Sequence, residues 1–235
     1  MGYYVVRLAH RTVPFMVLLL LSACASTPKP LTSPVPGKWV ETIQSAVAVS
    51  IKQGEESKSA RGYLIFRRPD RFHLALIAPF GQSLLDVYSD GKSFICLIPV
   101  KQTAYRGSLD ELPEQDGVRL WGLMSWVVEQ PPIANSNSTE QDNVTIDGRR
   151  EKILYDERGL AVRRIAENGD RVDYRDYGSV DGVPFPMGVE LSDRNGIKVS
   201  VTFDEPEINR PVEEAVLAPS LDNVTILPFS AFQGF

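Results

Sequence analysis

Few side chains in this sequence have the types and spacing that catalysis or metal binding requires. There are two cysteines and two histidines, and His10 falls in an N-terminal segment that we expect to be removed. His73 shares one face of an expected strand with Ala75 and Ile77, which favours a packed or surface histidine over a general base. No cysteine–histidine cluster has zinc-ligand spacing, and neither a glycine-rich loop opening a helix nor a G-x-S-x-G motif occurs. We therefore expect no enzyme, no metal site and no cofactor.

The side chain with the clearest chemistry is the thiol of Cys24. It ends the run Leu21-Ser22-Ala23-Cys24, which resembles the lipobox of bacterial lipoproteins. The small side chains suit a narrow peptidase site, and the thiol accepts a diacylglycerol. Residues 1–23 begin with basic side chains and continue into the apolar run Val13–Leu21, which is shorter than the roughly 20 helical residues that span a bilayer. We predict a lipoprotein signal peptide with Cys24 as the lipid-attachment residue; the alternative is an ordinary secretory signal with a chance cysteine.

The residue after Cys24 bears on which membrane carries the anchor. Ala25 stands where enterobacterial lipoproteins kept at the inner membrane have aspartate, so this resemblance implies the outer membrane, with the protein facing the periplasm. The chain has 25 basic and 30 acidic side chains and no basic stripe, which argues against a nucleic-acid partner. With Cys24 acylated, Cys96 has no partner for a disulfide, and its apolar surroundings predict a small core residue.

The remaining chain divides into a tether and a β-rich domain. Residues 24–37 are rich in proline, serine and threonine, which predicts a flexible tether. Residues 38–204 alternate apolar and polar side chains between turn dipeptides such as Asp90-Gly91 and Asn195-Gly196. This pattern predicts a mainly β fold of about eleven strands, in one large antiparallel sheet with an apolar face. A sheet of that size is expected to curl around something.

One segment changes to a helical period. In residues 117–129 an apolar stripe repeats at helical spacing, and Pro131-Pro132 end it; the stripe consists of Val118, Trp121, Met124, Ser125 and Val128. We expect one helix here and polar loop from Ile133 to Gln141.

Four stretches within residues 58–203 together carry a resemblance to one protein family. In chain order they are Arg61-Gly62-x-Leu64-x-Phe66 leading through Asp70-Arg71-Phe72 to Ala78-Pro79-Phe80-Gly81, then Leu123-x-x-Trp126-Val127-Val128 before Pro131, then Tyr174-x-x-Tyr177 with Pro186, Glu190 and Leu191, and finally Leu191-Ser192-Asp193 before Ile197-Lys198-Val199. In their order and spacing, the four pieces resemble the LolB family of outer-membrane lipoproteins.

The resemblance implies a half-barrel of antiparallel sheet, with helices covering an apolar concave face that holds the acyl chains of a passenger lipoprotein. It further implies a protein that accepts lipoproteins from a LolA-type periplasmic carrier and inserts them among outer-membrane lipids; we expect a monomer. Our candidates for the cavity wall are Leu64, Phe66, Phe72, Leu74 and Leu76. The alternative for these residues is an ordinary closed core, which needs an equally apolar face.

Phe80 is the candidate for membrane delivery. It lies between Pro79 and Gly81 at an expected hairpin tip, at the place where the family has an exposed apolar residue in a protruding loop. In the family this loop is thought to aid delivery of acyl chains into the membrane. The alternative is a loop phenylalanine tucked back onto the sheet.

The chain departs from the family pattern at both ends. The family has a long helix before its first strand, whereas only Pro36–Gln44 is available here, so we expect that helix to be shortened or missing. Residues 205–235 form a C-terminal extension with an apolar finish, which either covers the cavity in place of the helix or contacts a partner. The competing function is an anchored half-barrel that binds lipid or serves an envelope assembly without transfer activity.

The anchor gives the first testable prediction. Changing Cys24 to alanine removes the acyl acceptor, so we expect an uncleaved or soluble precursor that takes up no radiolabelled palmitate in cells. A Cys24→Ala protein that is still acylated and matured at the same position would refute the lipoprotein interpretation.

Overall fold

The computed structural model describes residues 39–108, 111–112, 118–134, 139–144, 148 and 150–232. They belong to one compact unit, Leu31–Phe235. The expected signal peptide 1–23, the lipid-attachment residue Cys24 and the tether 24–37 lie outside the described residues, so their assignments stay predictions. None of the described helices is long and apolar enough to cross a bilayer.

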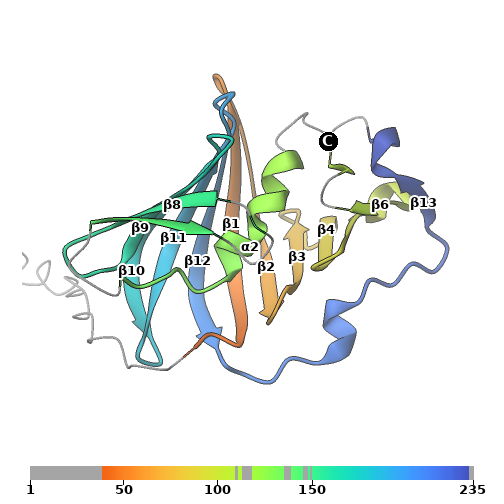
Figure 1. Cartoon of the computed structure of the whole chain (residues 1–235). Coiled ribbons are helices and arrows are strands. Elements are labelled where there is room, and N and C mark those ends of the chain that lie inside the picture. The colour runs from red at the N-terminus through yellow and green to blue at the C-terminus, as the bar shows by residue number, and fades with distance from the viewer. Residues whose placement is uncertain are drawn as a thin grey trace, which may run out of the picture. The chain divides into compact units, whose positions relative to one another are not determined.

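The described strands form a single unclosed sheet of thirteen strands (Figure 1). The strands are β1 Thr42–Gln53, β2 Glu56–Arg67, β3 Arg71–Ile77, β4 Ser83–Asp90, β5 Ser93–Ile98, β6 Thr103–Ser108, β7 Glu140–Val144, β8 Arg150–Tyr155, β9 Ala161–Ala166, β10 Arg171–Val180, β11 Val183–Ser192, β12 Lys198–Ile208 and β13 Thr225–Pro228. Their order is β13-β6-β5-β4-β3-β2-β1-β12-β11-β10-β9-β8-β7, and every pair is antiparallel except β13 with β6. The mainly β, half-barrel fold class is thereby confirmed.

Alternation along each strand separates two faces of the sheet. In β3, Phe72, Leu74 and Leu76 are buried, while His73 and Ala75 point to the opposite side. The register extends this alternation across neighbours, because Leu74 lies opposite Leu64 of β2 and Val87 of β4. We call the side that carries Leu64 and Leu74 the inner face and the other the outer face. The main hydrophobic core lies on the inner face.

Helices are short throughout the described residues. They are η1 Pro99–Lys101, η3 Val118–Leu123, α2 Met124–Val128, η4 Glu214–Leu217 and η5 Phe229–Ala231. The α2 helix lies against the inner face of the sheet (Figure 1). Residues 39–41 are not helical and β1 begins at Thr42, so the described part of the chain has no helix ahead of its first strand.

The helix expected over residues 117–129 is wrong in its detail. A 3₁₀-helix, η3, occupies residues 118–123 and only the last turn, α2, is α-helical. A 3₁₀-helix has three residues per turn, so its side chains do not keep the spacing of the expected stripe, although Met124 and Val128 of that stripe are buried as predicted. The residues that enter the core are Leu120, Leu123, Met124, Trp126, Val127 and Val128, while Ser125 stays partly exposed.

The C-terminal extension forms part of the sheet. β12 continues to Ile208, where it pairs with Ile43 of β1. The chain then crosses the outer face through η4 and adds β13 to the edge of the sheet, parallel to β6. β13 was not expected from the sequence, because its four residues follow no regular alternation long enough to predict a strand.

Candidate functional site

The five candidate wall residues lie together on the inner face. Leu64 of β2 is directly opposite Leu74 of β3, and Phe66 is opposite Phe72, while Leu76 faces Gly62. All five are buried, and Leu74 is only 1% exposed. They pack in one cluster with Met124, Trp126, Val127 and Val128 of α2. The sequence therefore located one continuous apolar surface, and in this structure the chain's own side chains cover it.

The α2 segment is fixed to the sheet by buried polar contacts. The hydroxyl of Tyr174 in β10 donates to the main-chain oxygen of Trp126 at 2.9 Å. The guanidinium of Arg164 in β9 lies 4.4 Å from the centre of the Trp126 ring, within the range of a cation–π interaction. One end of the cover is thus held by directional contacts in addition to apolar packing.

Arg164 also forms an ion pair inside this part of the core. Its Nε and Nη2 donate to the two carboxylate oxygens of Glu151 in β8 at 2.9 and 3.1 Å, and both side chains are buried. Burial alone would lower the pKa of Arg164, but Tyr174 and Glu151 outweigh it and the pKa is raised. Sequence reasoning missed this pair, since Arg163-Arg164 looks like two exposed charges until the register shows which one faces inward.

Phe80 stands at the tip of the β3–β4 hairpin and is 95% exposed. The turn is closed by the amide of Gly81 donating to the oxygen of Ala78 at 2.9 Å, and Ala78 donates to Gln82 at 2.8 Å. Pro79 suits the position after Ala78 in such a turn, and Gly81 has a φ of +83°, which most other residues avoid. The main chain of this turn is therefore well fixed while it leaves a large apolar side chain in solvent.

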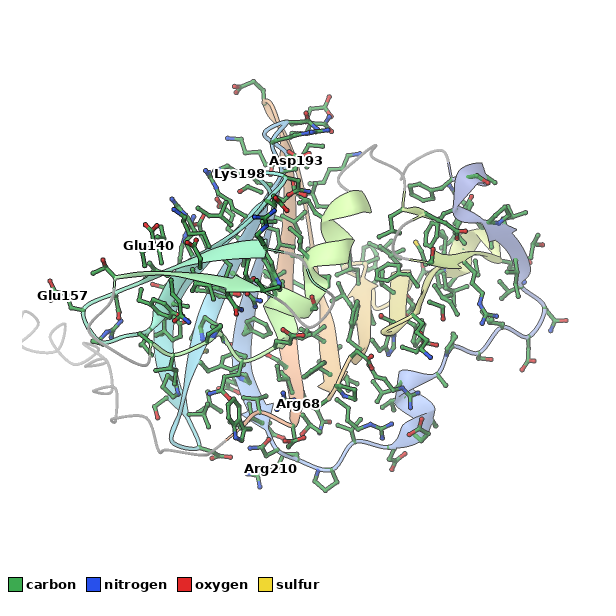
Figure 2. All side chains as sticks on the ribbon, in the orientation of Figure 1. Arg68, Glu140, Glu157, Asp193, Lys198 and Arg210 are labelled. Atoms are coloured by element: carbon green, nitrogen blue, oxygen red, sulfur yellow. The ribbon has the colours of Figure 1, made fainter. Side chains whose placement is uncertain are left out.

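Two more exposed apolar side chains flank this tip. Leu84 follows the turn at the start of β4, and Val100 lies in η1 between β5 and β6 and is 73% exposed. The pairing of Asp86 with Leu97 brings the start of β4 beside the end of β5, so both turns lie at the same end of the sheet. Because neighbouring strands run in opposite directions, both turns lie at the end of the sheet that holds Asp193. Arg68 and Arg210 lie at the opposite end (Figure 2).

His73 lies on the outer face, and both of its ring nitrogens have partners. The two ring nitrogens lie 3.0 Å from Asp86 Oδ1 and 3.0 Å from the main-chain oxygen of Val216. The ring stacks on Tyr88 with 4.1 Å between centroids. Among the described residues, no three histidine, cysteine or acidic side chains are grouped so that they could hold a metal ion.

Comparisons with known proteins agree with this geometry. Residues 41–205 match the family model described as outer membrane lipoprotein LolB. A DUF1329 family protein from Desulfovibrio piger is similar in structure, with a TM-score of 0.53 and 11% identity over 76% of this chain and 90% of that chain. A LolA superfamily protein from Nitrosomonas europaea has a TM-score of 0.48 and 10% identity over 80% and 93% of the two chains. At 11% identity the likeness to the Desulfovibrio piger protein shows the fold alone. No curated protein matches the chain.

The buried ion pair gives a stability prediction. Changing Glu151 to leucine leaves the Arg164 charge without its main partner, so we expect a loss of about 3 kcal/mol or more in the free energy of unfolding. The double variant Glu151→Leu, Arg164→Met should recover most of that loss, because no unpaired charge remains. Urea denaturation of the domain measures both, and a single variant as stable as wild type would show that the pair does not fix this end of the core.

Proposed function

Because the chain belongs to the LolB family of outer membrane lipoproteins, we propose that it accepts lipoproteins at the outer membrane and inserts them there. The passenger's acyl chains bind against the inner face of the sheet, with Leu64, Phe66, Phe72, Leu74 and Leu76 as wall. The donor is a LolA-type periplasmic carrier, and the protein acts as a monomer held by the lipid on Cys24.

The observation that carries the proposal is the position of Phe80. An exposed phenylalanine on a well-fixed turn is unfavourable in water, because its apolar surface stays hydrated. That surface is buried once the tip enters a bilayer, and Leu84 and Val100 beside it enlarge the apolar area. β3 and β4 connect this tip directly to the wall residues, so an acyl chain on the inner face is close to the membrane entry point.

Acyl chains must stay shielded from water on their way to the membrane. Each buried methylene contributes about 0.8 kcal/mol, so several chains exposed to water at once would cost far more than a domain's stability. An apolar face that holds the chains next to a tip inserted in the membrane avoids this exposure. The wall and Phe80 thus have complementary roles, holding and release.

The anchor has enough length for this geometry. About 15 residues separate Cys24 from Trp39, and such a segment spans at most about 50 Å. β1 has 12 residues, or about 40 Å of strand. The domain can therefore bring the Phe80 end of the sheet to the same membrane that holds the lipid.

The competing function, an anchored module without transfer, has one observation in its favour. Among the described residues, side chains of α2 and of the C-terminal segment pack on the inner face, so an acyl chain that binds to the surface they cover must displace them. Transfer activity separates the two functions.

Changing Phe80 to glutamate tests the delivery role. Because the side chain is in solvent, the free energy of unfolding should change by no more than about 0.5 kcal/mol. The variant should still take acyl chains from a donor, yet fail to release them into phosphatidylethanolamine–phosphatidylglycerol liposomes, because the membrane interior rejects a carboxylate.

Tyr63→Glu is the matched control, because Tyr63 is 57% exposed but lies on the outer face of β2. It should transfer like wild type. Normal transfer by a stable Phe80→Glu protein would remove the delivery role from this residue.

A further inference from the structure

The C-terminal segment passes from one face of the sheet to the other. On the outer face, Glu214 pairs with Arg67 and Arg71, and Leu221 and Val224 pack against the small cluster of Ile95, Leu97 and Ala104. β13 then forms the edge strand beside β6. After β13 the chain turns inward, and Phe229 and Phe232 join the core of the inner face. The segment therefore wraps around the sheet edge.

The two phenylalanine rings rest on a defined site on β5 and β6. The ring centroids of Phe229 and Phe94 are 6.2 Å apart. Phe232 contacts Tyr105 edge-on, with 5.0 Å between the ring centroids. Gly107 makes room for the first ring, since a Cβ there would be 2.9 Å from a carbon of Phe229. Cys96 pairs with Tyr105 and with Val87, so this site continues the inner face across β4 from Leu74.

The two covers of the inner face are held in different ways. α2 is fixed by the hydrogen bond from Tyr174 and by Arg164 against Trp126. The rings of Phe229 and Phe232 make apolar and aromatic contacts. They directly follow β13, which has four residues and pairs on one side only. Apolar contacts have no directional requirement, so an acyl chain can replace them, whereas it cannot replace the polar contacts of α2.

We propose that the segment carrying Phe229 and Phe232 is a displaceable cover, and that an acyl chain of the passenger binds beneath it on Phe94, Cys96 and Tyr105. This inference rests on the proposed function, because it names the place where the acyl chain enters the inner face. The cover shields the apolar site from water while no passenger is bound. Binding then exchanges two rings for an acyl chain on the same surface.

Cys96 is a built-in reporter of this exchange. It is the only cysteine of a soluble form comprising the compact unit 31–235, and it is buried next to Tyr105. Burial raises the pKa of its thiol to about 12, so both access and ionisation are suppressed while the cover is closed. Opening the cover should increase its rate of alkylation.

A disulfide that holds the cover shut tests the proposal. Arg106 and Pro228 are register partners in β6 and β13 and both are exposed, so cysteines at these positions can be joined next to Phe229. In the soluble form with Cys96→Ala, the oxidised Arg106→Cys, Pro228→Cys protein should bind a fluorescent palmitate analogue at least about tenfold more weakly than the same protein after reduction.

Alkylation of Cys96 by N-ethylmaleimide gives an independent measurement. Phe232→Ala should raise the rate about tenfold, in line with a more populated open state. Loss of a buried ring also lowers the melting temperature, so the rate is measured at a temperature where circular dichroism shows the sheet of the variant intact. Ile226→Ala is the control, because Ile226 is half exposed on β13 and lies outside the site. Its rate should match that of wild type.

The outcomes separate the cover from the function itself. Equal palmitate binding by the oxidised and reduced proteins would overturn the cover while leaving the proposed function in place. Absence of binding in the reduced, wild-type and Phe232→Ala proteins would refute the proposed function and the cover together. An equal alkylation rate in Phe232→Ala and wild type would also overturn the cover.

Discussion

The covering of one apolar sheet face is the constraint on which the rest of the structure depends. A single sheet that is apolar on one side must bury that side against another element. The inner face runs from β6 to β8, yet the described helices are short, and none precedes β1. Among the described residues, the segments that pack on it include η3 with α2 and the end of the C-terminal extension.

Under our proposal, the two covers explain how one surface is both a stable core and a binding site. At the β8–β10 end, Arg164, Glu151 and Tyr174 fix α2 through buried polar contacts that need exact partners. At the β5–β6 end, aromatic rings lie on an aromatic wall and can be exchanged for other apolar groups. Phe80 lies on the β3–β4 hairpin, next to the exchangeable end in the strand order. In the proposed function, acyl entry, holding and release thus fall on neighbouring strands.

Local patterns predicted most of the fold, and contacts distant in sequence account for what they missed. Alternation and turn dipeptides located the strands from β1 to β6 and from β8 to β12, and Pro79 and Gly81 located the tip that exposes Phe80. β7 begins at Glu140, inside the polar loop expected from Ile133 to Gln141, because its side chains are mostly polar and show no alternation. The 3₁₀ geometry of η3 was missed because apolar spacing alone does not separate three residues per turn from 3.6. β13 and the Glu151–Arg164 pair were missed because both depend on register between strands, to which no short stretch of sequence gives access. The roles of the wall residues and Phe80 stay predictions.

Photo-crosslinking in intact cells tests most directly whether the inner face holds acyl chains. A benzoylphenylalanine at Leu74 keeps the site apolar and reports what contacts it, and the same residue at Tyr63 samples the outer face of the neighbouring strand. We expect adducts with lipoproteins from position 74, lost when the passenger's lipid-bearing cysteine is removed, and none from position 63. A functional protein that gives no adducts at 74, or equal adducts at both positions, would contradict this account.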